Sequence, residues 1–97
     1  MAGYMIATVR GINNVEKLQA YSKAAGPTVQ QHGGVPVITP MSNIDFVEGA
    51  AGKSMMVFRF PSYEQAVAWY NSPEYQEAKA LRLGAVEADV VLVEGTD

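Results

Sequence analysis

The chain has 97 residues, of which 48% are hydrophobic, a length that suits one core and is too short for two domains. It contains no cysteine, which excludes a disulfide framework, a thiolate metal site and a cysteine nucleophile. A net charge of -3 with only seven basic residues argues against a nucleic-acid partner, and no apolar run approaches the roughly 20 residues of a membrane span.

The N-terminal stretch predicts a strand followed by a long helix. It has no basic leader, so we expect a cytoplasmic protein with one domain over residues 1–97. Tyr4–Arg10 is rich in strand formers. Asn13 or Asn14 then caps a helix whose apolar face is marked by residues at three- to four-residue spacing. These residues are Val15, Leu18, Tyr21 or Ser22, Ala25, Val29 and His32.

Glycine and proline residues predict where this helix ends and where it is interrupted. Gly33-Gly34 ends it, because two glycines in succession disfavour further helical turns. We expect Gly26-Pro27 to interrupt it with a kink, since proline lacks an amide donor and clashes with the preceding turn.

Three β-prone runs follow. Val35–Thr39 and Ile44–Gly49, on either side of a turn at Pro40–Asn43, predict a hairpin or one long bent strand. Pro36 and Pro40 place this part at a sheet edge, because proline cannot donate to a strand ladder. After a small-residue loop at 49–52, Ser54–Phe60 alternates and predicts a central strand.

The C-terminal part predicts a helix in two segments. Ser62 and Gln65 form a capping box that starts a helix over about Tyr63–Tyr70, and Asn71 ends it. Ser72-Pro73-Glu74 then provides a cap, a first-turn proline and an acid for a second segment.

This second segment extends to about Leu83, with Gly84 as its terminator, and Ala88–Glu94 predicts the last strand. The order is therefore β-α-β-β-α-β. It predicts an α+β, ferredoxin-like fold in which a four-stranded antiparallel sheet carries both helices on one face.

Three of the strands are largely apolar on both faces, whereas a sheet with one wet face should alternate apolar and polar residues. The helices cover one face, and no other segment remains to cover the second. We therefore expect a homodimer in which two copies of the sheet pack together.

The segment FPSYEQAVAWYNSPEYQEAKALRLGAVEADVVLVEG, Phe60–Gly95, resembles DUF1330, an uncharacterised bacterial family. So do GYMIATV at the start, YSKAAGPTVQQHGG and FVEG. The resemblance implies the dimeric α/β-barrel superfamily, in which two ferredoxin-like sheets close back to back. That superfamily includes cofactor-free monooxygenases, isomerases, decarboxylases and haem-handling proteins, and its members usually hold a small-molecule pocket between sheet and helices. It leaves the activity open.

His32, the only histidine, can be a general acid or base because its ordinary pKa is about 6.5. The alternative is a helix-end residue that caps a carbonyl or balances the negative end of the dipole. Single histidines and dispersed carboxylates do not give metal-ligand spacing, and no glycine loop suits a nucleotide. We expect no metal and no cofactor.

Trp69, Tyr70 and Tyr75 surround the helix break and can line a pocket for a flat or aromatic molecule, or simply pack the core. Arg82 follows Tyr75 by about two turns and can bind a substrate carboxylate with its planar fork, or pair with a nearby glutamate.

Two functions follow. The first is a small homodimeric enzyme or binding protein for an organic metabolite, an acid or an aromatic, with cofactor-free proton transfer by His32, an anion clamp at Arg82 and aromatic walls. The second is a non-catalytic assembly or regulatory module in which the same aromatics pack the core and the dimer seam.

Overall fold

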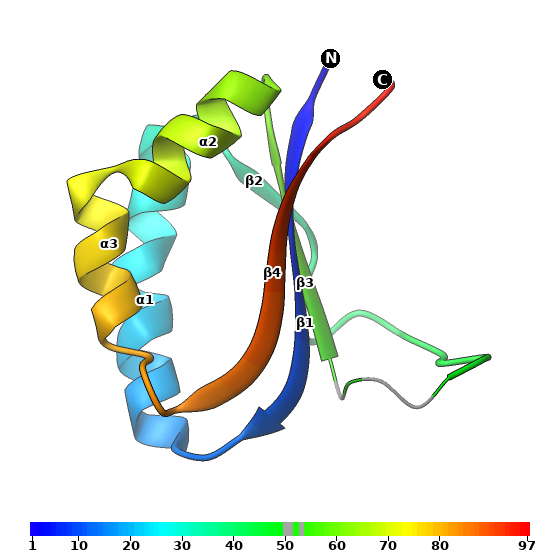
Figure 1. The fold of residues 1–97 in the computed structure, drawn as a ribbon, viewed down its shortest axis with the longest axis vertical. Coiled ribbons are helices and arrows are strands. Elements are labelled where there is room, and N and C mark those ends of the chain that lie inside the picture. The colour runs from blue at the N-terminus through cyan, green and yellow to red at the C-terminus, as the bar shows by residue number, and fades with distance from the viewer. Residues whose placement is uncertain (50–51, 53) are drawn as a thin grey trace.

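The structure, a computed structural model, describes residues 1–49, 52 and 54–97. It has one four-stranded antiparallel sheet with the helices on one face (Figure 1). The elements are β1 (Gly3–Ile12), α1 (Val15–Gln31), β2 (Val35–Ile38), β3 (Ser54–Phe60), α2 (Tyr63–Asn71), α3 (Pro73–Ala80) and β4 (Val86–Glu94). This is the predicted α+β, ferredoxin-like arrangement, which is confirmed.

The strands lie in the order β2-β3-β1-β4. Met5 of β1 is opposite Phe58 of β3 on one side and Leu92 of β4 on the other. β3 is therefore a central strand, as predicted. β2, which contains Pro36, is an edge strand, where proline is tolerated because its missing amide can face away from the sheet.

Side-chain caps define the helix starts. The Asn14 side chain accepts a hydrogen bond from the Lys17 amide at 3.0 Å, and Ser62 Oγ accepts one from the Gln65 amide at 3.1 Å. Ser72 Oγ accepts from the amide of Tyr75 at 3.2 Å. Each cap provides a hydrogen-bond partner for an amide that has none within its helix. Because cap and amide lie only three residues apart, these helix starts could be predicted from the sequence.

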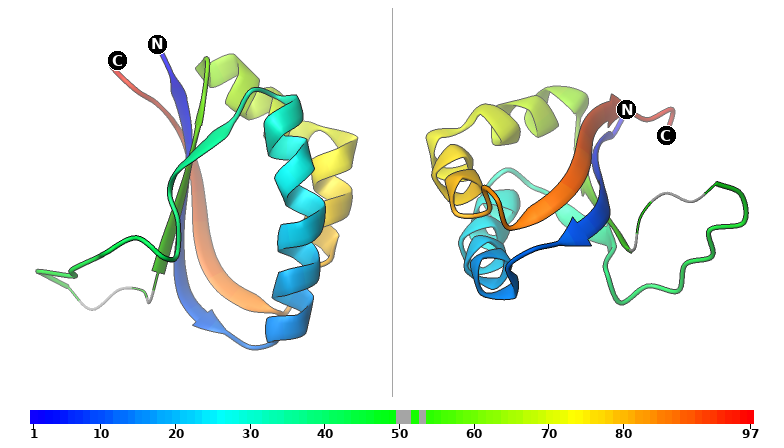
Figure 2. Two further views of the ribbon diagram at one scale, coloured as in Figure 1. Left: turned by 180° about the vertical axis from the view of Figure 1, so that it is seen from behind. Right: turned by 60° about the horizontal axis from the view of Figure 1, so that its bottom comes forward.

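The predicted interruption of α1 at Gly26-Pro27 is wrong. α1 is a single helix from Val15 to Gln31, and Figure 2 shows it as one continuous coil along the sheet. Gly26 and Pro27 are exposed, whereas Ala25, Thr28 and Val29 are buried. Burial of these neighbours outweighs the loss of one helical hydrogen bond at the proline.

Residues 39–49, here called the arm, leave the sheet on the side away from the helices (Figures 1 and 2). The arm contains no strand, so the predicted strand at Ile44–Gly49 is wrong. A turn directs the chain off the edge, with the Ser42 amide bonded to the Thr39 carbonyl at 2.9 Å. Ile44–Gly49 therefore has no neighbouring strand with which to pair. Of the predicted small-residue loop, Ala50 and Ala51 lie outside the described residues.

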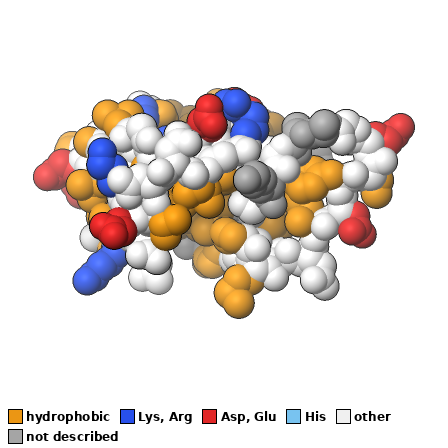
Figure 3. Space-filling model, turned by 90° about the horizontal axis from the view of Figure 1, so that it is seen from below, with side chains coloured by type: hydrophobic (Ala, Val, Ile, Leu, Met, Phe, Trp, Pro, Cys, Tyr) orange, Lys and Arg blue, Asp and Glu red, His pale blue; other side chains and the backbone are white. Residues whose placement is uncertain are grey.

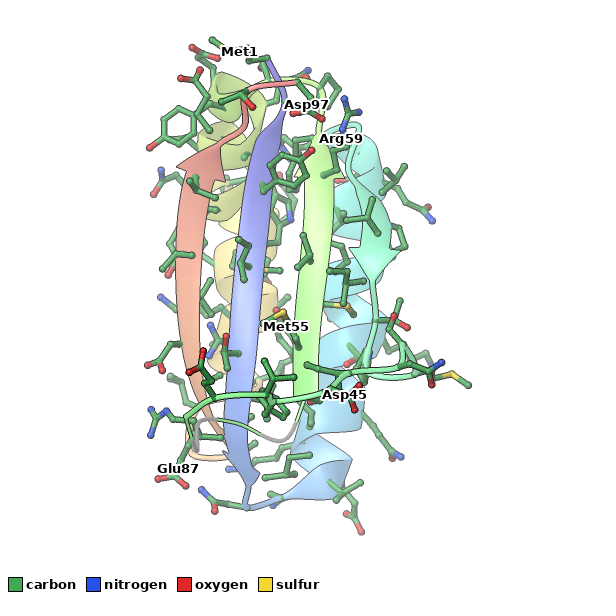
Figure 4. All side chains as sticks on the ribbon, turned by 90° about the vertical axis from the view of Figure 1, so that its right-hand side faces the viewer. Met1, Asp45, Met55, Arg59, Glu87 and Asp97 are labelled. Atoms are coloured by element: carbon green, nitrogen blue, oxygen red, sulfur yellow. The ribbon has the colours of Figure 1, made fainter. Side chains whose placement is uncertain are left out.

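The core lies between the helices and the inner face of the sheet. Its largest fully buried side chains are Trp69, Tyr75 and Phe60. The opposite face, called the open face, is seen in Figure 4 with the arm crossing in front of its strands. Residues on this face are paired across all four strands in one apolar row. The row consists of Val91, Ile6, Val57 and Ile38.

Candidate functional site

A cavity of about 440 Å³ lies between the inner face of the sheet and the helices. Its wall extends from Met5 and Phe58 in the interior to Ile12 and Val86, where β1 ends and β4 begins. Ile12 is exposed, so the cavity reaches solvent at this end of the molecule. Figure 3 views this end, where hydrophobic side chains gather across the middle of the surface.

The floor of the cavity is apolar apart from Ser54, and residues of all four strands contribute to it. Ala7 and Ala88 are its smallest side chains, and Gly26 lies on the opposing helix α1. Larger side chains at these positions would fill the space. The strand residues of the floor are Met5, Ala7, Val9, Ile12, Pro36, Ser54, Met56, Phe58, Val86, Ala88 and Val90.

The helical side of the cavity brings three polar side chains together. The hydroxyl oxygens of Tyr21 on α1 and Tyr75 on α3 lie 3.0 Å apart, within hydrogen-bond distance. The two rings meet edge to face, with centroids 6.3 Å apart. The guanidinium carbon of Arg82 lies 5.4 Å from the centroid of the Tyr21 ring, in cation–π contact. We call these three residues the polar cluster.

The protonation of the polar cluster is set by its surroundings. Burial raises the pKa of Tyr21 well above its ordinary value, and Tyr75 raises it further. Burial lowers the pKa of the Arg82 guanidinium, but the neighbouring Tyr75 and Tyr21 raise it more, so it lies above its ordinary value. Tyr21 therefore remains a neutral hydroxyl and Arg82 a cation at physiological pH.

Tyr75 and Arg82, both predicted as binding residues, line the cavity, whereas Trp69 and Tyr70 are not part of its lining. Trp69 is fully buried and packs on Tyr75, with ring centroids 4.2 Å apart. Tyr70 also packs on Tyr75, at 5.4 Å, and its hydroxyl accepts a hydrogen bond from Lys79 Nζ at 2.8 Å. Packing against these two aromatic rings fixes the position of Tyr75.

His32 is also outside the lining of the cavity. It is the C-cap residue of α1, and its ring Nδ1 lies 2.9 Å from the carbonyl oxygen of Thr28. A carbonyl oxygen only accepts hydrogen bonds, so Nδ1 carries the proton here. His32 is thus engaged by the end of its own helix.

Tyr21 was not predicted from the sequence as a site residue. The available signal was that Tyr21 shares a helix face with Leu18 and Ala25, which also line the cavity. Nothing local indicated its hydroxyl contact with Tyr75, which is 54 residues away in the chain.

The DUF1330 family, described as a domain of unknown function, matches residues 2–96. The chain belongs to this family. The predicted resemblance is therefore confirmed for this DUF1330 domain. No curated protein matches the chain.

Solved structures of other proteins share the fold at low sequence identity. A protein of unknown function from Rhodopseudomonas palustris has a TM-score of 0.74 at 19% identity, covering 99% of this chain and 83% of its own. A dimeric ferredoxin-like protein of unknown function from Jannaschia has a TM-score of 0.66 at 14% identity, covering 98% and 100%. A variant of SnoaB, a cofactor-independent oxygenase from Streptomyces nogalater, has a TM-score of 0.65 at 8% identity, covering 99% and 93%.

In the part of the chain that the structure describes, no helix combines the length and the hydrophobicity that a membrane span requires. Across residues 1–49, 52 and 54–97, no group of three or more His, Asp or Glu is arranged to hold a metal ion.

Proposed function

We propose that this DUF1330 domain is a homodimeric binding protein for a small organic metabolite, which occupies the cavity between the sheet and the helices. The observation that carries the proposal is the cavity itself. Its volume of about 440 Å³ falls within the range of roughly 300–1,000 Å³ typical of small-molecule sites. Apolar walls with a few convergent polar groups are also typical of such sites.

The described lining favours binding over acid–base catalysis. A general base must lie within hydrogen-bond reach of the proton that it removes. The described lining contains neither a carboxylate nor an imidazole, and Tyr21 is held in its neutral form. His32 faces its own helix end and has no part in this proposal.

Filling the cavity tests the binding site. Ala7→Leu adds a larger side chain to the floor, while Ala20→Leu makes the same change at an exposed position of α1 outside the lining. We expect isothermal titration calorimetry with octanoate and octanamide to show one probe bound per protomer in the unmodified protein. We expect Ala7→Leu to abolish this binding and Ala20→Leu to retain it.

The thermal midpoint of Ala7→Leu provides the folding control, and it should not fall, because the added methyl groups occupy empty space. Absence of binding by both probes to the unmodified protein would contradict the proposed site. So would unchanged binding to a folded Ala7→Leu variant.

The dimer is supported by the open face. Val91 and Val93 are 52% and 42% exposed on β4, and Val35 is 51% exposed on β2 at the opposite edge. Apolar rows that continue across a sheet indicate an interface, and a second copy provides a matching surface. Several proteins that share the fold are themselves dimeric.

A charge on the open face tests the dimer. We expect Val91→Glu to shift the mass measured by light scattering from dimer to monomer, because the interface would bury an unpaired carboxylate. Val15→Glu, at an exposed position at the start of α1, is the control and should leave the mass unchanged. A monomeric unmodified protein would overturn this part of the proposal.

A further inference from the structure

We infer that the polar cluster selects an anion, and that the preferred ligand of the cavity is a monocarboxylate with an apolar body. This inference rests on the proposed function and names the ligand class of that site. It follows from the charge of Arg82, the hydrogen-bonding capacity of the cluster and the composition of the remaining wall.

Within residues 1–49, 52 and 54–97, Arg82 forms no ion pair with a carboxylate. The chain has ten Asp and Glu residues, and all of them lie in the described part, because the three undescribed positions are Ala50, Ala51 and Lys53. The ion pairs among the described residues are Arg10 with Asp89 and Arg59 with Asp97, and neither involves Arg82.

The described residues therefore provide no counterion for the charge of Arg82 where it meets the cavity. Its guanidinium is half-buried beside the Tyr21 ring, so water compensates it only in part. An anionic ligand bound here would interact favourably with a cation that is already positioned and partly desolvated.

Hydrogen-bonding capacity points to the same class. A guanidinium has five N–H donors and accepts nothing. The two tyrosine hydroxyls share one hydrogen bond at 3.0 Å, which leaves one of their two protons free to be donated. A head group that accepts several hydrogen bonds and donates none matches this surplus of donors.

The rest of the wall limits the ligand to one charge. Arg82 is the only charged side chain in the described lining, and the floor is apolar apart from Ser54. A carboxylate matches a single arginine fork in both charge and geometry. A phosphate dianion would retain uncompensated charge in apolar surroundings, which is costly.

Calorimetry on the unmodified protein tests the inference with octanoate, octanamide and octyl phosphate as probes. We expect octanoate to bind at least about tenfold more tightly than octanamide, the ratio that a charge-assisted hydrogen bond provides. Arg82→Gln should remove this preference, mainly by weakening the binding of octanoate. Lys17→Gln makes the same charge change at an exposed position outside the lining and should preserve the preference.

Two further variants separate charge from geometry. Arg82→Lys keeps the charge but loses the planar fork, so we expect it to retain only part of the preference. Tyr21→Phe removes one hydroxyl from the cluster and should weaken the binding of octanoate more than that of octanamide. The comparison of probes on the unmodified protein does not depend on whether any variant folds.

The outcomes distinguish this inference from the proposed function. Equal binding of octanoate and octanamide would overturn the charge selectivity and leave the binding site standing. Tighter binding of octyl phosphate than of octanoate would overturn the carboxylate class. Binding of none of the three probes would overturn both the inference and the proposed function.

Discussion

The indole Nε1 of Trp69 donates a hydrogen bond to Oγ1 of Thr28 at 3.0 Å, linking α2 to α1 inside the core. The Thr28 hydroxyl donates its own proton to the carbonyl oxygen of Ala25 at 2.6 Å. Thr28 and Trp69 are both buried. The hydroxyl thus satisfies the one polar atom of the largest side chain in the core, on which Tyr75 packs.

Replacing Thr28 by valine keeps the volume but leaves the Trp69 N–H without a partner in a dry interior. We expect Thr28→Val to lower the free energy of unfolding by about 1–3 kcal/mol, as measured by urea denaturation. Thr96→Val, at an exposed position near the C-terminus, should change it by less than about 0.5 kcal/mol. A similar loss in both variants would contradict this role of Thr28.

Gly34 permits close packing between α1 and β3. A Cβ at this position would lie 2.6 Å from both Phe60 Cε1 and Val29 Cγ1, and these two side chains are themselves buried and cannot retreat. We expect Gly34→Ala to destabilise the protein by about 1–3 kcal/mol in thermal or urea unfolding.

Gly26, within α1, differs from Gly34 because it has free space around it. A Cβ there would meet nothing within 4 Å, and alanine is the better helix former. Gly26→Ala should therefore stabilise the protein by about 0.5–1 kcal/mol. If both glycine substitutions changed the free energy of unfolding in the same direction, this difference in packing between Gly34 and Gly26 would be contradicted.

Ser72 serves both α2 and α3. Its hydroxyl donates to the Trp69 carbonyl at 2.7 Å and accepts from the Tyr75 amide at 3.2 Å. We expect Ser72→Ala to cost about 1–2 kcal/mol of stability. Ser62→Ala removes one cap bond at a more exposed site, so chemical denaturation should show a smaller loss.

The hydroxyl of Tyr4 donates a hydrogen bond to the side-chain carboxylate of Asp97 at 2.6 Å. This bond, more than the nearby Arg59, holds the pKa of the Asp97 carboxyl below its ordinary value. We expect Tyr4→Phe to raise this pKa in an NMR titration, whereas Tyr63→Phe should leave it unchanged.

The sign of the pH effect follows from the direction of this shift. Because the folded-state pKa is lowered, the stabilising contribution of Asp97 is present above the ordinary carboxyl pKa and is lost as the pH falls through the folded-state value. The stability difference between Tyr4→Phe and the unmodified protein should therefore shrink at acidic pH. A difference that grows on acidification would contradict the assignment.

Local features of the fold were readable from the sequence. The bounds Ser54–Phe60 of β3 were predicted as they occur, because strand formers alternate there between two loop signals. Caps at Ser62 and Ser72 bond to amides three residues later, so both partners lie within one short window of sequence. Such signals do not depend on the rest of the chain.

The errors concern features that the tertiary structure decides. Ile44–Gly49 has the residue types of a strand, but a strand requires a neighbour, and the turn at Thr39–Ser42 carries this segment away from the sheet. Pro27 has a strong local preference against a helix, but burial of adjacent residues on the sheet outweighs it.

The candidate site was predictable only in part. Tyr75 was identified as one of the aromatic residues around the helix break at Asn71, and Arg82 because it follows Tyr75 by about two turns. Their partner Tyr21 comes from another helix, and only packing of α1 beside α3 brings its hydroxyl to Tyr75. The catalytic role predicted for His32 has not been tested and stays a prediction.

The cavity draws its two kinds of wall from different layers of the fold. The polar cluster comes from α1, α3 and the residues that follow α3, whereas the floor belongs to the four strands of the sheet. Backbone pairing fixes the strands independently of the side chains that they present to the helices. Substitutions at Ala7 or Ala88 can therefore resize the floor without displacing Tyr75 or Arg82. Such substitutions would change the length of molecule that the proposed site accepts, while the groups proposed to hold its carboxylate stay in place.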